Sequence, residues 1–122
     1  MVIGLDFDGT CVTHEYPATG VDVGAVPVLR KLVAKGHKIV LHTMRYGVSL
    51  HNAVAWFGKR KIPLYGINEN PDQKEWTTSP KIYADIFIDD AALGCPLIFP
   101  GEGRPYVDWV AVEKELIRHK IL

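Results

Sequence analysis

The sequence predicts an α/β fold built on a mainly parallel five-stranded sheet with helices on both faces. Short, nearly continuous apolar segments alternate with longer segments that have helical periodicity. With 122 residues, the chain has room for one hydrophobic core but not two, so we expect a single domain over residues 1–122. A formal net charge of zero and 23% charged residues give no bulk indication of nucleic-acid or anionic-membrane binding.

Five segments are expected to be strands because they are rich in β-branched or aromatic residues and lack polar alternation. That pattern is typical of strands covered on both faces. In chain order, the segments are residues 2–7, 38–43, 63–68, 85–90 and 96–100, of which 63–68 has the weakest pattern.

Two helices are expected to connect the first three strands. In residues 23–36, Pro27 suits a first helical turn and Gly36 suits a C-terminal stop. In residues 48–62, Ser49 is expected to be the N-terminal cap. The apolar positions with helical spacing are Val26, Leu29, Leu32 and Val33 in the first segment, and Leu50, Ala53, Val54 and Phe57 in the second.

The remaining segments complete the expected fold. Residues 107–122 predict a closing helix capped by Asp108, with Trp109, Val112 and Leu116 on one face. Residues 69–81 lack either periodicity and are expected to be a loop with room for one helical turn. The alternation of strands and helices predicts that the sheet is parallel.

Polar side chains follow three of the expected strands. Asp6 and Asp8 end the first, Thr43 the second, and Asp89 and Asp90 the fourth. Ligands of parallel sheets bind beyond the carboxyl ends of the strands, and four carboxylates gathered there require a neutralising cation. Because oxygen-only ligands favour Mg²⁺, which readily shares a substrate phosphate, we expect phosphoryl-transfer chemistry.

These residues fall in stretches that resemble the four ordered motifs of the haloacid dehalogenase (HAD) superfamily. The stretches are "LDFDGT", "VLHT" and "SPKIYADIFIDD", and the resemblance extends over residues 2 to 95. It implies a three-layer, Rossmann-like (HAD-like) domain and a hydrolase, namely a magnesium-dependent phosphatase. The second Asp of the first motif favours a phosphatase over the dehalogenase and phosphonatase branches.

The resemblance implies a role for each carboxylate. Asp6 would be the nucleophile that forms an aspartyl-phosphate. Asp8 would protonate the leaving oxygen and later deprotonate water. Magnesium would be ligated by the side chains of Asp6 and Asp89 and by the backbone carbonyl of Asp8. Asp90 would act through a water molecule or as a direct ligand, and the sequence does not rank these two alternatives.

Roles are also implied for residues around the carboxylates. Thr43 would bind a phosphoryl oxygen and Lys81 would balance charge there, with Lys74 as a competing candidate. Gly9 would let the chain turn sharply and bring its backbone close to the metal and substrate. Arg45 is not part of these motifs, but it follows Thr43 by two residues at the same edge of the sheet. It would therefore contact a second phosphate or the leaving group, or it is an ordinary surface arginine.

Structural interpretations stand beside these functional ones. The Asp8-Gly9 pair is also typical of a simple turn, and Asp89 and Asp90 would suit a helix cap. Loop aromatic residues either contact substrate or cover the core; these are Tyr16, Tyr46 and Trp76. The histidines show no ligand spacing and are assigned no role; they are His14, His37, His42, His51 and His119.

The motif spacing leaves no room for the cap domain that is common in this superfamily. We therefore expect the capless type, with residues 11–22 as a short flap over an open site. An open site would admit a phosphate on a polynucleotide end or another bulky molecule. Alternatively, a homo-oligomer would close it around a small sugar or nucleotide phosphate. Transfer to an acceptor other than water and a non-catalytic phosphate-binding module are further alternatives.

A cytoplasmic location without membrane contact is expected. No apolar run approaches the roughly 20 residues of a membrane span, and Asp6 and Asp8 interrupt any signal-peptide pattern. Cys11 and Cys95 provide neither a disulfide framework nor a zinc site, and we expect reduced thiols.

Overall fold

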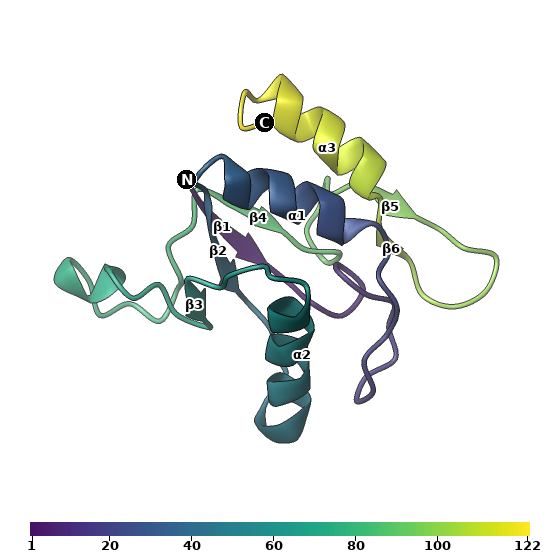
Figure 1. Ribbon diagram of the computed structural model, residues 1–122, viewed down its shortest axis with the longest axis horizontal. Helices are drawn as coiled ribbons and strands as arrows, with labels where there is room; N and C mark the ends of the chain where they lie inside the picture. The colour runs from purple at the N-terminus through teal and green to yellow at the C-terminus, as the bar shows by residue number, and fades with distance from the viewer.

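A four-stranded parallel sheet forms the centre of the protein, whose computed structural model describes all of residues 1–122. The strands are β1 (Val2–Leu5), β2 (Lys38–Leu41), β3 (Gly66–Ile67) and β4 (Ile86–Ile88). Their order across the sheet is β3-β2-β1-β4 (Figure 1). The α/β class and the parallel sheet are therefore confirmed.

The expectation that residues 96–100 form a fifth strand of the main sheet is wrong. Within these residues, β5 (Leu97–Ile98) pairs antiparallel with β6 (Tyr106–Val107), in a two-stranded sheet of its own. Pro96 and Pro100 lack the N–H groups that a sheet ladder needs, so the strand cannot extend far in either direction. The sheet thus ends at β4, and the chain turns back through the β5–β6 hairpin.

Three helices occupy the segments that the periodicity predicts. They are α1 (Ala25–Ala34), α2 (Gly47–Lys59) and α3 (Trp109–Arg118). The Asp108 side chain accepts a hydrogen bond from Ala111 N at 3.1 Å, which confirms it as the cap of α3. Ser49 is not the cap of α2, because the helix begins two residues earlier and the Ser49 hydroxyl donates to Tyr46 O at 2.8 Å.

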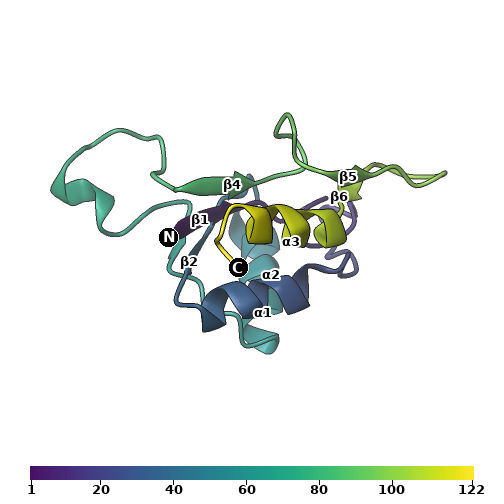
Figure 2. The same ribbon diagram turned by 90° about the horizontal axis from the view of Figure 1, so that it is seen from above.

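The three helices pack on one face of the sheet, so the expectation of helices on both faces is wrong (Figure 2). The residues of the four-stranded sheet in the same buried cluster as the helices are Ile3, Leu5, Ile39, Leu41 and Ile88. The intervening row, Val40–Gly4–Phe87, faces the other side. The connection from β3 to β4 contains only a 3₁₀ turn, η1 (Gln73–Glu75), and so supplies no helix for that side.

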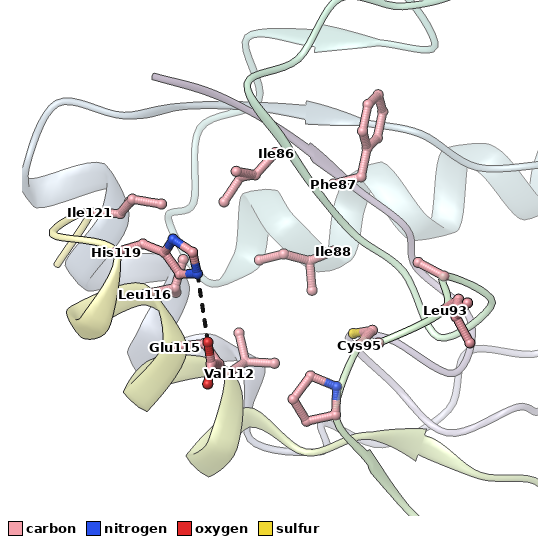
Figure 3. Close-up of a pocket in the computed structure, with 13 residues that line it drawn as sticks. Ile86, Phe87, Ile88, Leu93, Cys95, Val112, Glu115, Leu116, His119 and Ile121 are labelled. Atoms are coloured by element: carbon pink, nitrogen blue, oxygen red, sulfur yellow. Dashed lines mark ion pairs between the residues drawn. The ribbon is translucent and has the colours of Figure 1, made fainter.

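The side chains of β4 show this alternation directly. Ile86 and Ile88 point toward α3, whereas Phe87 points away from it (Figure 3). The Phe87 ring lies over Gly4, where a Cβ atom would come within 2.5 Å of a ring carbon. Gly4 therefore leaves room for an aromatic ring where a helix would otherwise cover the sheet.

The C-terminal segment supports the loop that follows β1. The Trp109 indole donates from Nε1 to Thr10 O at 2.7 Å, and Val107 N donates to Gly9 O at 3.0 Å. Both contacts connect residues about a hundred positions apart to the same turn. None of the helices has the length and apolar character needed to cross a membrane.

Candidate active site

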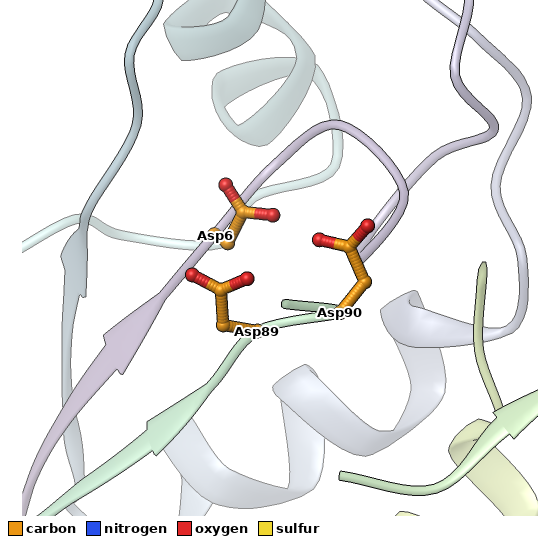
Figure 4. A group of neighbouring side chains, drawn as sticks. All are labelled: Asp6, Asp89 and Asp90. Carbon is orange, nitrogen blue, oxygen red and sulfur yellow. The ribbon is translucent and has the colours of Figure 1, made fainter. Parts of the chain in front are cut away.

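Three carboxylates meet where β1 and β4 end (Figure 4). Asp6 follows β1, and Asp89 and Asp90 follow β4, the strand hydrogen-bonded beside it. Each contributes one carboxylate oxygen to a group in which all three oxygens lie within 4.8 Å of one another. Since no helix begins after Asp90, the helix-cap interpretation of Asp89 and Asp90 is wrong.

Thr10 and His14 hold these carboxylates in place. The buried Thr10 hydroxyl donates to Asp6 Oδ2 at 2.8 Å, and its oxygen accepts from Asp90 N at 3.1 Å. His14 Nε2 lies 2.9 Å from Asp90 Oδ2. Neither contact follows from the sequence pattern. Thr10 belongs to the first motif, whereas His14 reaches Asp90 only through the conformation of the flap.

Burial, together with the neighbouring carboxylates, raises the pKa of Asp6 to about 8. Burial is the main cause, and the hydrogen bond with Asp90 and the charge of Asp89 add to it, against an opposing hydrogen bond from Thr10. Burial acts to raise the pKa of Asp90 too, but hydrogen bonds with Asp6 and His14 outweigh it and lower that pKa. Without a cation, Asp6 therefore retains a proton at neutral pH, which a divalent ion would displace.

Asp8 does not join this group, because its carboxylate is paired with Arg45. Arg45 Nε donates to Asp8 Oδ2 and Nη2 donates to Asp8 Oδ1, both at 2.7 Å. The remaining N–H groups of Arg45 donate to the carbonyl oxygens of Pro17, Ala18 and Ser49.

Arg45 is only 2% exposed, so the surface interpretation of this residue is wrong. All five of its N–H donors are engaged within the protein. This geometry favours a role in holding Asp8, and a direct contact of Arg45 with substrate stays a prediction.

Thr43, which follows β2, lies in the same cavity as Asp6 and Asp89. Its hydroxyl oxygen accepts from Arg45 N at 3.1 Å, and its own N–H donates to Asn68 Oδ1 at 2.9 Å. The hydroxyl proton is left to donate to a ligand in the cavity.

Gly9 is required both by backbone conformation and by space. Its φ of +78° lies in the left-handed region, and a Cβ atom there would come within 1.9 Å of His14 Nε2 and 2.5 Å of Asp90 Oδ2. Its N–H donates to Val12 O at 2.7 Å. Gly9 thus brings its backbone next to the carboxylates, while its N–H group is already used within the turn.

The structure does not bring Lys81 or Lys74 together with the carboxylates. Both lysines are exposed, and each lines a different cavity on the connection between β3 and β4. The residues on either side of Lys81, Pro80 and Ile82, line a smaller cavity to which Asp6 and Asp89 also contribute. Trp76 packs edge-on against Tyr83 and lies outside the carboxylate cavity.

The open cavity around the carboxylates has a volume of about 560 Å³. The flap supplies His14 and Tyr16 to its lining, and the segment after β2 supplies Tyr46. Arg104, from the β5–β6 hairpin, is a further lining residue that no motif indicated. A second cavity of about 320 Å³, between β4 and α3, is mainly apolar and contains none of these carboxylates (Figure 3).

The fold and the site together define the class of protein. It is a parallel α/β protein with an oxygen-rich candidate cation site at the carboxyl edge of its sheet, where such sheets bind ligands. No protein-family model matches the chain, and no curated protein matches it.

One solved structure, described as that of a conserved protein from Bacteroides thetaiotaomicron, is similar over nearly the whole chain. The TM-score is 0.79 and the sequence identity is 35%, covering 98% of this chain and 91% of that one. The chain therefore belongs to the same family as this conserved Bacteroides protein.

Proposed function

We propose that the protein is a magnesium-dependent phosphomonoester hydrolase of the capless HAD type. The observation that carries the proposal is the meeting of Asp6, Asp89 and Asp90 at the ends of two neighbouring strands, in a cavity that also contains Thr43. The ordered motifs of the sequence support the same reaction, because they provide a residue for each step.

The donor set fits Mg²⁺. The grouped ligand atoms are carboxylate oxygens, with no sulfur among them, which suits a hard cation. The side chains of Asp6, Asp89 and Asp90 and the backbone carbonyl of Asp8 would hold the ion, with Asp90 bound directly or through water. When bound, the ion neutralises the carboxylates and polarises a phosphoryl oxygen.

The reaction divides into two displacements at phosphorus. A carboxylate oxygen of Asp6 forms a bond to phosphorus while the ester P–O bond breaks, and the leaving oxygen takes a proton from Asp8. Water then attacks the aspartyl-phosphate and gives a proton to Asp8. The bond between phosphorus and the Asp6 oxygen breaks, which releases phosphate and restores the carboxylate. In both steps, the Thr43 hydroxyl donates a hydrogen bond to a phosphoryl oxygen.

The hydrogen bonds from Arg45 restrict how Asp8 can act as a proton donor. Both oxygens of the Asp8 carboxylate accept hydrogen bonds from Arg45, so the proton that Asp8 donates must occupy a lone pair that these contacts leave free. The two contacts keep Asp8 in a defined position at the edge of the cavity. In this proposal Arg45 is a positioning residue.

The substrate is a phosphomonoester that enters an open site. Polynucleotide ends and other bulky phosphates fit a cavity without a cap domain, and a homo-oligomer acting on a small sugar or nucleotide phosphate is the alternative. The free thiols of Cys11 and Cys95 agree with a cytoplasmic location for either substrate.

Phosphate release tests the proposal. The wild type, Asp6→Asn and a control, Asp72→Asn, would be incubated with magnesium and a panel of phosphorylated oligonucleotides, nucleotides and sugar phosphates. Asp72 is exposed and lies outside the carboxylate cavity. We expect release by the wild type and the control but not by Asp6→Asn. Phosphate release by Asp6→Asn would contradict the assignment of Asp6 as the nucleophile. Tight binding of a phosphorylated compound by the wild type without phosphate release would indicate a non-catalytic phosphate-binding module.

A further inference from the structure

The residues at the rim of the carboxylate cavity are more exposed to solvent than those at its floor. Thr10 beneath the carboxylates is fully buried, and Asp6 and Thr43 are half-buried. Arg104 and Tyr46, by contrast, line the mouth of the same cavity and are exposed, Tyr46 by 76%. A phosphoryl group bound at the floor would leave the rest of its substrate against this rim.

Arg104 is the one cation of the cavity whose side chain is free. Arg45 uses all five of its N–H groups within the protein, and His14 is paired with Asp90. Arg104 forms none of the ion pairs of the protein. Its guanidinium can offer up to five N–H donors to an anion and matches a carboxylate or phosphate in a bidentate contact.

Aromatic side chains lie on the same rim. Tyr16 comes from the flap and Tyr46 from the segment before α2. The Tyr16 ring is held by the Arg45 guanidinium, whose central carbon is 5.2 Å from the ring centroid. Two tyrosine rings and one free guanidinium suit a leaving group that combines a ring with a negative charge.

We propose that Arg104 binds an anionic group on the leaving group of the substrate, so that the preferred substrates are phosphomonoesters of ring compounds with a second negative charge. This inference rests on the proposed function for the position of the phosphoryl group, and it adds the substrate class. The second charge comes either from a small acid or from the next phosphate of a polynucleotide.

Two matched substrate pairs test the inference and distinguish these sources. Phenyl phosphate is compared with 4-carboxyphenyl phosphate, and thymidine 5′-phosphate with the 5′-phosphorylated thymidine dinucleotide. KM and kcat are measured for the wild type, Arg104→Ala, Arg104→Lys and a control, Arg118→Ala, which removes an exposed arginine of α3.

We expect Arg104→Ala to raise KM about three- to tenfold for the charged member of at least one pair, with little change in kcat or in the KM of its partner. Arg104→Lys restores part of the preference, and Arg118→Ala matches the wild type. The pair that responds identifies the source of the charge. Equal changes for both members of each pair, or no change in either pair, overturn the inference.

A binding measurement separates this inference from the proposed function. Titration calorimetry with the same four compounds and magnesium gives the ratio of Kd values within each pair, for Asp6→Asn and for Asp6→Asn combined with Arg104→Ala. Failure of the wild type to release phosphate would overturn the proposed function alone. If removal of Arg104 abolishes the Kd preference for the charged compound, the binding of the second charge by Arg104 is still supported. An unchanged Kd ratio, or no binding of any of the four compounds, would overturn the inference.

Discussion

Arg45 and Asp8 form a bidentate ion pair whose two N–H···O distances are both 2.7 Å, with the Arg45 side chain 1% exposed. The guanidinium also packs against the Phe7 ring, with its central carbon 5.0 Å from the ring centroid. The pair joins the loop after β1 to the segment after β2, and three carbonyl oxygens complete the environment of the guanidinium.

Removal of the Arg45 charge is expected to destabilise the protein strongly. Arg45→Met leaves the Asp8 carboxylate without its cation and removes the donors to three carbonyl oxygens, at a cost of about 3–5 kcal/mol in the free energy of unfolding. Urea denaturation measures this. Arg30→Met is the matched control, because exposed Arg30 donates only to Arg60 O. Equal losses in the two variants would contradict the structural role of the pair.

Gly9→Ala is expected to lower both stability and activity, because the new Cβ atom meets His14 and Asp90 in a backbone conformation that already disfavours it. The conformational strain alone costs about 1–3 kcal/mol. Gly103→Ala has the same strain, at a φ of +82°, but meets no atom within 4 Å. Thermal unfolding and phosphate release would be measured for both variants. Equal losses of stability and activity in the two would show that the approach of the Cβ atom to His14 and Asp90 is unimportant.

Magnesium affinity is expected to rise with pH through the titration of Asp6. Because the pKa of Asp6 is about 8 in the metal-free protein, binding must displace a proton below that pH. The affinity should increase by about tenfold per pH unit between pH 6 and 8 and then level off. Calorimetry in buffers of different ionisation enthalpy also measures the released proton. A flat pH profile would show that Asp6 is ionised without the ion.

The raised pKa of Asp6 also predicts how the stability of the metal-free protein depends on pH. The pKa of Asp6 is higher folded than in the unfolded chain, where it is about 4, so its contribution to stability is full below pH 4. That contribution declines as the pH rises to 8. Because the pKa of Asp90 is lowered, its contribution to stability is lost only below about pH 4, outside the range from pH 4 to 8. Thermal unfolding without metal should show the decline in the wild type and its absence in Asp6→Asn.

Lys81 is expected to matter for the reaction although its ammonium lies outside the carboxylate cavity. Its neighbours Pro80 and Ile82 line a neighbouring cavity that shares Asp6 and Asp89 with it, so rotation of the long side chain would bring the charge toward the phosphoryl group. Lys81→Ala should lower kcat about a hundredfold, as loss of a transition-state contact does, and Lys74→Ala should not. Steady-state kinetics of both variants checks this, and the reverse order would transfer the role to Lys74.

The helices and the parallel strands could be predicted because their signals are local. The spacing of Val26, Leu29 and Leu32 is that of one helix face, and these residues are buried in α1. The topology then predicted that the polar residues after β1 and β4 share an edge. The partner of residues 96–100 could not be predicted, since a short apolar run does not specify which strand it pairs with.

The contacts around Arg45 and His14 could not be predicted because they depend on loop conformation. Arg45 follows Thr43 by two residues, and nothing in that spacing indicates the carbonyl oxygens of Pro17 and Ala18 that surround it. His14 reaches Asp90 across 76 positions in the sequence. The face of the sheet without helices follows from the segment between β3 and β4, which is a loop, as expected, with only a 3₁₀ turn.

The most direct test of the proposed function is detection of a phosphoryl group on Asp6. Asp8→Asn, which should slow hydrolysis of the intermediate, would be mixed with magnesium and 4-nitrophenyl phosphate, whose leaving group needs no proton from Asp8, then quenched in acid and analysed by peptide mass spectrometry. The account predicts a phosphoryl adduct on the peptide that contains Asp6, and its absence from the variant that also carries Asp6→Asn. An adduct on another residue would contradict the assignment of Asp6 as the nucleophile.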